Sequence, residues 1–300
     1  MIEAKNLCKS FGKIKAVDNV SLSIEDGRVF GLIGTNGAGK STFLRMAAGV
    51  LKPDKGSIEI NGRAVFEEPE VKEDFFYISD EMYFFPNSTP DAMSAFFEKM
   101  YPKYDRARYK KLMDDFSLSG RRKINTFSKG MKKQLSIILG LSAMTKYMYC
   151  DETFDGLDPV MRQGVKSLFA SDMSDRGFTP VIASHNLREL EDICDTVGLL
   201  HQGGILLSED LDEVKADIHK LHCVLPKETD MDALKKELNI LVEERKGSLC
   251  TFTIRGSEDE IMKTIQNYEP LFAEMLPLSL EEIFISETGV TGYDIKKFIS

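Results

Sequence analysis

Hydrophobic and polar residues along the first 210 or so positions switch between patterns typical of strands and patterns typical of helices. Residues 20–24 alternate apolar with polar side chains, and residues 29–33 (VFGLI) form a short apolar run ending at glycines, as expected of a buried strand. Residues 40–50 place apolar side chains at helical spacing, and residues 56–60 alternate again before an Asn-Gly turn signal. Further strands are predicted over residues 75–78, 147–150, 181–184 and 196–200.

Helical patterns separate these predicted strands. The pattern is helical from about residue 89 to residue 141, and further helices are predicted from Pro159 and over residues 187–194. Because strands and helices alternate in this order, we expect an α/β fold with a mostly parallel sheet covered by helices on both faces.

The pattern changes near residue 217. A strand over 222–225, a helix over 230–238, strands over 240–244 and 249–254 and a helix over 258–268 predict a small α+β unit of about 80 residues. The sequence therefore predicts a large domain over residues 1–215, with a helical subdomain at about 88–142, and a C-terminal extension over residues 216–300.

Composition and charge exclude several classes of protein. The 300 residues carry a net charge of −9, which disfavours a nucleic-acid partner because such proteins are usually basic. No run of about 18 apolar residues is present, so we expect no membrane-spanning helix. The first ten residues lack the apolar core of a signal peptide, and five cysteines without a CxxC pair predict free thiols in a reducing cytosol.

The segment GTNGAGKS, residues 34–41, follows the predicted strand 29–33 and begins a helix, which is the context that a phosphate-binding loop requires. Glycines let backbone N–H groups turn towards phosphate oxygens, and the following helix adds the partial positive charge of its N-terminus. Lys40 can reach the β- and γ-phosphates, Ser41 can offer a hydroxyl to Mg²⁺, and Thr42 can bond a phosphate oxygen. The candidate residues for a nucleoside triphosphate are Gly34, Thr35, Asn36, Gly37, Ala38, Gly39, Lys40, Ser41 and Thr42.

Two carboxylates end the predicted strand 147–150. An acid at the carboxyl end of such a strand faces the ligand crevice, so Asp151 is a candidate Mg²⁺ ligand. Glu152 is the candidate general base that polarises the attacking water, and His185, which follows the strand 181–184, is a candidate hydrogen-bond donor to the γ-phosphate.

The segment FSKGMKKQL, residues 127–135, completes a series of motifs. With the phosphate loop, the Asp-Glu pair, the GLDP sequence at 156–159 and the later histidine, it resembles the signature motif of the ATP-binding subunits of ABC transporters, in an SKGM form. This resemblance covers about residues 1–212. It implies a P-loop NTPase domain of the ABC type, with a mostly parallel sheet, an antiparallel β subdomain and a helical subdomain.

The resemblance also implies roles for further residues. ATP and Mg²⁺ would be sandwiched between two chains, with Ser128, Lys129, Gly130 and Met131 of one chain contacting the nucleotide held by the other. Ser128 is in addition a plausible helix N-cap, and a free helix N-terminus favours anions. Phe11 matches the aromatic residue that stacks on adenine.

One position departs from the family pattern. The loop after residues 76–78 usually carries a glutamine that senses Mg²⁺ and the membrane subunit, whereas Asp80 stands there in this chain. A carboxylate can still ligate Mg²⁺ but adds negative charge near the phosphates. Aromatic residues that follow this loop lie where the family receives short helices of the membrane subunit: Phe84, Phe85, Phe96, Phe97, Tyr101 and Tyr104.

The function implied is that of an ATP-hydrolysing subunit that powers a separate transmembrane permease, with an exporter favoured by the SKGM signature and by LSLEEIFISETG at 278–289. The active pair is a homodimer or a heterodimer of ATPase subunits, and the expected location is cytoplasmic, on the inner face of the cell membrane. Two alternatives remain: a soluble ABC-type ATPase acting on ribosomes or DNA, and a weakly hydrolysing regulatory subunit that binds ATP.

Overall fold

The computed structural model describes the backbone of residues 1–290 and the side chains as far as Ser286, so the predicted positions 291–300 of the C-terminal extension lie outside the described residues. The chain divides into two compact units, residues 1–208 and residues 209 onward. Among the described residues, no helix is both long and apolar enough to cross a membrane.

A six-stranded sheet forms the centre of the first unit, in the order β10-β9-β3-β8-β7-β6. The pairs β9–β3, β3–β8, β8–β7 and β7–β6 are parallel, so their carboxyl ends meet at one edge. Every residue of β3, β7 and β8 is buried, which explains why these strands read as continuous apolar runs. The strands are β3 (Phe30–Ile33), β6 (Phe75–Ile78), β7 (Tyr147–Asp151), β8 (Thr179–Ser184), β9 (Thr196–His201) and β10 (Gly204–Asp210).

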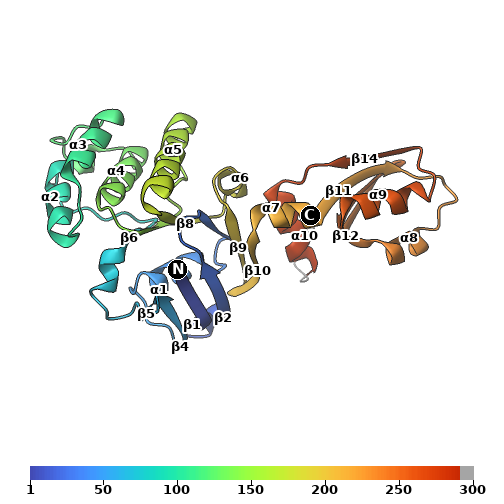
Figure 1. Cartoon of the computed structure of the whole chain (residues 1–300), viewed down its shortest axis with the longest axis horizontal. Helices are drawn as coiled ribbons and strands as arrows, with labels where there is room; N and C mark the ends of the chain where they lie inside the picture. The colour runs from blue at the N-terminus through green and yellow to red at the C-terminus, as the bar shows by residue number, and fades with distance from the viewer. Residues whose placement is uncertain (291–300) are drawn as a thin grey trace. The chain divides into compact units, whose positions relative to one another are not determined.

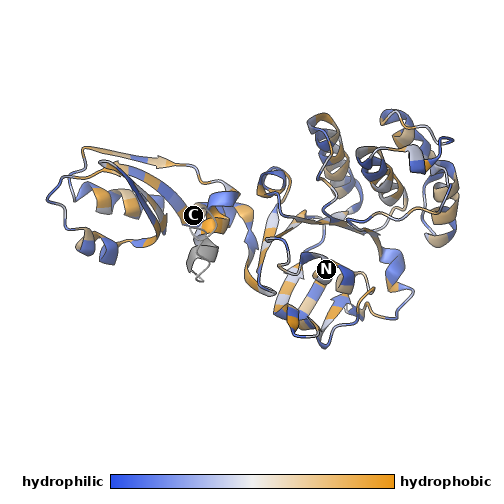
Figure 2. Ribbon diagram, turned by 180° about the vertical axis from the view of Figure 1, so that it is seen from behind, coloured by the Kyte–Doolittle hydropathy of each residue, from blue (hydrophilic) through white to orange (hydrophobic). Residues whose placement is uncertain are grey.

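A second, antiparallel sheet has the order β2-β1-β4-β5. Helix α1 (Lys40–Ala47) shares one core with both sheets, because Phe43 and Leu44 cluster with Ile2 and Ile58 on one side and with Tyr149 on the other. Figure 2 shows hydrophobic and hydrophilic residues alternating along these strands, as expected of a sheet with one solvated face. The strands are β1 (Ile2–Phe11), β2 (Ile14–Ile24), β4 (Lys55–Ile60) and β5 (Arg63–Ala64).

Helices cover the opposite face of the six-stranded sheet (Figure 1). The helical subdomain contains α2 (Pro90–Met100), α3 (Arg106–Asp115) and α4 (Lys129–Ser142). Each begins at a polar N-cap whose side-chain oxygen accepts a backbone N–H: Thr89, Asp105 and Ser128. The remaining helices of this unit are α5 (Pro159–Arg176), α6 (Leu187–Glu191) and the 3₁₀ turns η1 (Val71–Asp74) and η2 (Ile124–Thr126).

A buried carboxylate joins the helical subdomain to α5. Asp172 is 2% exposed, and it accepts a hydrogen bond from Arg108 of α3 at 2.6 Å and another from Arg176 at 2.7 Å. Because Asp172→Ala would leave two partly buried guanidinium groups without this partner, we expect it to lower the free energy of unfolding by about 3–5 kcal/mol.

Chemical denaturation of the purified protein measures this loss. Asp175→Ala, at an exposed position one helical turn away, is the control and should change the stability by less than about 0.5 kcal/mol. Equal effects of the two substitutions would show that Asp172 does not hold α3 against α5.

The second unit is an antiparallel sheet in the order β12-β13-β11-β14, with β11 paired to both β13 and β14. Its element order β-α-β-β-α-β is that of a ferredoxin-like unit, and α8 and α9 cover the core formed by Leu221, Phe252 and Ile261. On α10, Glu282 pairs with Lys220 of β11 at 2.5 Å. The elements are α7 (Leu211–Asp217), β11 (Ile218–Val224), α8 (Met231–Glu237), β12 (Asn239–Lys246), β13 (Leu249–Arg255), α9 (Glu258–Gln266), β14 (Phe272–Leu276) and α10 (Leu280–Val290).

Candidate active site

The loop between β3 and α1 is shaped by its glycines. Gly39 has φ +108°, and a Cβ built there would lie 2.2 Å from the carbonyl oxygen of Ala16. A Cβ at Gly34 would lie 2.6 Å from the carbonyl oxygen of Leu200. Between them the Ala38 N–H donates to the Thr35 carbonyl at 3.1 Å and closes a turn. Glycine is therefore required at both positions for the loop to reach α1.

A cavity of about 310 Å³ lies over this loop and is called here the phosphate-loop cavity. It brings predicted residues from separate parts of the chain to one place, including Phe11 from β1, Asp80 after β6 and Glu152 after β7. The described residues that line it are Phe11, Ala16, Asn36, Gly37, Gly39, Lys40, Ser41, Thr42, Asp80 and Glu152.

Lys40 and Glu152 line this cavity, and His185, which is not among the described lining residues, contacts Glu152. The Lys40 ammonium donates to the Gly34 carbonyl at 2.7 Å and lies 3.5 Å from Oε1 of Glu152. The other carboxylate oxygen, Oε2, lies 2.8 Å from Nδ1 of His185. Glu152 has φ +50°, a strained backbone conformation for a residue with a side chain, and such strain is found most often at functional sites.

Ser41 and Asp151 form the second polar pair of the site. The Ser41 hydroxyl donates to Oδ1 of Asp151 at 2.9 Å, and the Tyr77 hydroxyl lies 3.4 Å from Oδ2. Burial raises the pKa of Asp151 above its usual range, and the Glu152 and Asp80 carboxylates act in the same direction, while the Ser41 hydrogen bond opposes them. The Arg45 guanidinium also opposes this rise, and a buried carboxylate with two further carboxylates nearby favours a cation beside it.

The signature segment, residues 127–135, lies apart from the phosphate-loop cavity of its own chain. Among the described residues that line this cavity, none comes from positions 128–131. The Ser128 side chain instead caps α4 by accepting the Met131 N–H at 3.2 Å, and Lys129 lies 3.9 Å from Asp155. A Cβ at Gly130 would lie 3.3 Å from the carbonyl oxygen of Gly156, so the start of α4 packs directly on the loop after β7.

Phe11 and Asp80 occupy the rim of the cavity. The Phe11 ring is 49% exposed, which leaves a flat face open for stacking, and the Lys9 ammonium lies 5.9 Å from its centroid. Asp80 is an exposed residue that adds a third carboxylate near Asp151 and Glu152.

Three residues of this region were not identified from the sequence: Ala16, Tyr77 and Lys133. Ala16 contributes its backbone, which no side-chain pattern reveals. Tyr77 lies in an apolar strand, where a tyrosine is usually a packing residue. Lys133 is a lysine within a basic helix, and only its exposure of 1% distinguishes it from its neighbours.

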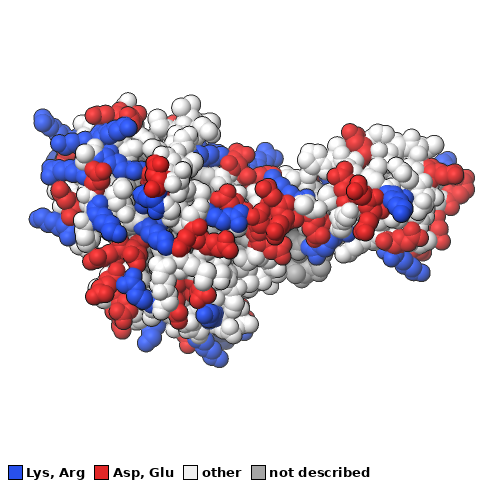
Figure 3. Space-filling view, viewed as in Figure 1, with Lys and Arg blue, Asp and Glu red and all other residues white. Residues whose placement is uncertain are grey.

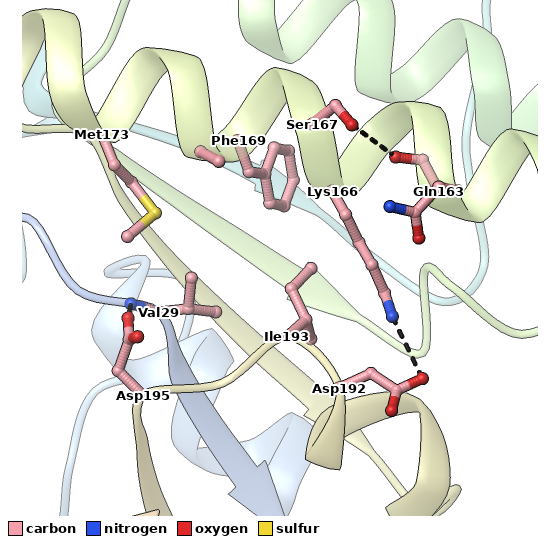
Figure 4. Close-up of a pocket in the computed structure, with 10 residues that line it drawn as sticks. Val29, Gln163, Lys166, Ser167, Phe169, Met173, Asp192, Ile193 and Asp195 are labelled. Carbon is pink, nitrogen blue, oxygen red and sulfur yellow. Dashed lines mark hydrogen bonds and ion pairs between the residues drawn. The ribbon is translucent and has the colours of Figure 1, made fainter.

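A second cavity in the same unit, of about 520 Å³, lies between α5 and the segment after α6 (Figure 4). Its charged groups are engaged with the protein, because Lys166 pairs with Asp192 at 3.3 Å and Asp195 accepts the Val29 N–H at 2.7 Å. These side chains fix the segment after α6 and provide no arrangement of nucleophile and base.

The sequence is similar to ATP-binding subunits of known transporters. The family model described as "ABC transporter" matches residues 17–155. The ABC transporter ATP-binding protein YtrB of Bacillus subtilis (strain 168) is 32% identical over 289 residues, which cover 96% of this chain and 98% of that protein. The bacitracin transport ATP-binding protein BcrA of Bacillus licheniformis is 31% identical, over 72% of this chain and 71% of that protein.

Solved structures share the fold of the first unit. An ATP-binding subunit of an ABC transporter superposes with a TM-score of 0.66 at 26% identity, over 72% of this chain and 92% of that chain. A dimeric ATP-binding cassette in a post-hydrolysis state, bound to ADP and Pi, has a TM-score of 0.64 at 21% identity, over 70% of this chain and 99% of that chain. The resemblance and the α/β fold that were inferred from the motifs are thereby confirmed.

Proposed function

The chain belongs to the ABC transporter ATP-binding proteins, and we propose that it hydrolyses ATP in the phosphate-loop cavity to drive a separate transmembrane permease. The observation that carries this proposal is that Lys40 and Glu152 line one cavity, where Ser41 contacts Asp151 at 2.9 Å, although 111 residues separate Lys40 from Asp151 in sequence.

The residues fit ATP and its metal ion. Hydroxyl and carboxylate oxygens, such as Ser41 Oγ and Asp151 Oδ1 at 2.9 Å from each other, are ligands that Mg²⁺ prefers, with phosphate oxygens and water completing the set. Asp80 lines the same cavity and would offer a further carboxylate oxygen. Mg²⁺ supplies positive charge against the phosphates when it is bound. Phe11 would stack on the adenine, and Lys40 would bind the β- and γ-phosphates.

Hydrolysis then requires a positioned base. A water oxygen attacks the γ-phosphorus, the bond to the β–γ bridging oxygen breaks, and Glu152 accepts the proton of the water. His185 holds Oε2 of Glu152 at 2.8 Å and thereby orients the carboxylate. The products are ADP and phosphate, and charge that develops in the transition state is stabilised by Lys40 and the loop N–H groups.

The position of the signature segment favours a two-chain site, because residues 128–131 lie outside the cavity of their own chain. In a homodimer or heterodimer, Ser128, Lys129, Gly130 and Met131 would contact the nucleotide bound by the partner. Residues 88–142 hold twelve Lys and Arg against five Asp and Glu in an otherwise acidic chain. Figure 3 shows Lys and Arg gathered over the helical subdomain, and this positive charge suits the phosphates of a partner's nucleotide.

An exposed aromatic surface supports a membrane partner. The rings of Tyr83, Phe85 and Phe96 are 75%, 43% and 37% exposed, and they continue through ring contacts of 4.9–6.2 Å to Phe97 and Tyr101. We call these five residues the aromatic face. Of the other predicted aromatics, Tyr104 packs inside the helical subdomain, where its hydroxyl bonds Ser94 at 2.8 Å. Exposed clustered aromatics are typical binding anchors, and here they would hold the permease.

The relatives indicate the direction of transport. Their names describe bacitracin transport, linearmycin resistance and doxorubicin resistance. We therefore propose an export system, with this chain on the cytoplasmic side of the membrane, attached through its permease.

Substituting the aromatic face tests this partnership. Tagged protein is purified from detergent-solubilised membranes of its source cell, and co-purifying proteins are identified by mass spectrometry. The wild-type chain should recover a polytopic membrane protein. Tyr83→Ser/Phe96→Ser should recover at least about tenfold less of it, because two exposed anchors are lost.

The matched control is Val50→Ser, which removes a side chain 60% exposed elsewhere on the same unit and should recover the wild-type amount. Equal recovery by the double variant would exclude the aromatic face as the docking site. Recovery of ribosomal or DNA-bound proteins in place of a membrane protein would contradict the transport function itself.

A further inference from the structure

A lysine of α4 is buried beside the loop that carries the candidate base. Lys133 is 1% exposed, and its Nζ donates to the backbone carbonyl of Glu152 at 2.5 Å and to that of Asp155 at 2.6 Å. We propose that Lys133 is a positioning residue, which fixes the backbone of residues 152–155 and thereby holds the Glu152 carboxylate in place for hydrolysis. This inference rests on the role of Glu152 proposed above.

A buried ammonium group is costly unless its hydrogen-bonding capacity is used. Burial lowers the pKa of Lys133, while the carboxylates of Asp155, Asp80 and Glu152 act in the opposite direction. Packing alone would be served by an uncharged side chain at this position of the helix. The two carbonyl oxygens account for the presence of a lysine there.

The loop after β7 needs such support because its first residue is strained. Glu152 has φ +50°, a conformation that costs free energy for a residue with a Cβ. Its N–H donates to the Ala183 carbonyl at 2.9 Å, and its carbonyl accepts from Lys133. Both backbone polar groups of Glu152 are therefore fixed, and its side chain is aimed between Lys40, at 3.5 Å, and His185, at 2.8 Å.

Lys133 also connects this loop to the signature segment. It lies on the same helix as Ser128 and Gly130, and the start of that helix packs on Gly156. In the proposed two-chain arrangement, these residues serve the partner's nucleotide, whereas Glu152 serves the nucleotide of its own chain. The buried side chain of Lys133 thus connects the signature segment with residues 152–155 of the same chain.

Three variants in an ATPase assay test the proposal. Lys133→Met keeps the length and removes the donors, so we expect kcat to fall by about 10- to 100-fold, since a shift of about 1 Å at a catalytic group has effects of this size. The KM for ATP should stay within about twofold, because Lys40 and the phosphate loop are untouched. Lys133→Gln keeps an N–H donor and should lose less activity than Lys133→Met. Lys72→Met, at an exposed lysine of η1, should behave like the wild type.

Thermal unfolding and binding of a fluorescent ATP analogue confirm that each variant is folded. If Lys133→Met does not fold, Lys133→Gln takes its place in the test. Its kcat should then fall while its KM for ATP stays within about twofold of the wild-type value. Wild-type kcat in the folded Met variant would overturn the proposal, and so would a fall in nucleotide affinity that matches the fall in kcat.

Glu152→Gln is measured in the same assay to separate this proposal from the function on which it rests. If Glu152→Gln retains normal turnover, the base assignment fails. If Glu152→Gln loses turnover while the Lys133 variants retain it, only the positioning role of Lys133 fails.

Discussion

Glu152→Gln should lower the rate of ATP hydrolysis by about 10²- to 10⁴-fold, the range typical of a lost general base. Glutamine has nearly the same shape and can keep the contact with Nδ1 of His185, now at 2.8 Å from Oε2, but it cannot accept the proton of the attacking water. ATP affinity should be retained, because the phosphate loop and Lys40 are unchanged. Phosphate release under steady-state conditions gives the rate, and titration with a fluorescent ATP analogue gives the affinity.

Glu68→Gln is the control for this substitution, since Glu68 is exposed in the loop before η1. It should hydrolyse ATP at the wild-type rate. A Glu152→Gln variant that turns over ATP normally would exclude Glu152 as the general base. The candidate base would then be Asp80, a further carboxylate that lines the cavity.

Lys40→Ala should weaken ATP binding by about 10²- to 10³-fold, because a charge-assisted contact in a buried site is lost. Lys40 is 5% exposed, and its ammonium is already held at the loop by the carbonyls of Gly34, at 2.7 Å, and Thr35, at 3.2 Å. Isothermal titration with ATP and Mg²⁺ measures the change, and thermal unfolding shows whether the loop still folds.

The control is Lys72→Ala, which removes one exposed positive charge from η1 and should leave the affinity unchanged. Unaltered ATP affinity in the Lys40 variant would contradict the assignment of residues 34–41 as the phosphate loop.

The phosphate loop, Asp151 and Glu152 could be predicted because their chemistry requires particular residue types at the ends of apolar strands. A linear pattern cannot give the spatial order of the strands. In the sheet, β8 separates β3, which precedes the phosphate loop, from β7, which ends at Asp151, and Ser41 of α1 lies 2.9 Å from Asp151. The roles of Lys40, Asp151 and Glu152 themselves stay predictions.

The contacts of Lys133 could not be predicted from the sequence. Its acceptors are backbone carbonyls 19 and 22 residues away, and every residue has a carbonyl, so no residue type signals the contact. The same limit applies to Ala16, because its carbonyl oxygen lies only 2.2 Å from the position of a Cβ built on Gly39.

Secondary structure differs from the prediction at element ends and also in whole elements that were not predicted: β1 (Ile2–Phe11), β10 (Gly204–Asp210) and α7 (Leu211–Asp217). The strand predicted at 20–24 is the end of β2 (Ile14–Ile24). The first two residues of β2 are exposed, and its first half pairs with the long strand β1 through register shifts that disrupt the alternation. The helix predicted over 187–194 ends at Glu191, because the chain turns there and brings Cys194 against β3, where a Cβ on Gly31 would lie 2.7 Å from its Sγ. The strand predicted at 222–225 begins at Ile218, paired with Arg255.

The most direct test of the account identifies the nucleotide that remains bound to tagged Glu152→Gln after incubation with ATP and Mg²⁺. Chromatography of the released nucleotide should show mainly intact ATP in this variant, whereas wild-type protein treated in the same way should hold ADP. Mainly ADP in the Glu152→Gln protein would contradict the account, because hydrolysis would then have taken place without the carboxylate on which it depends.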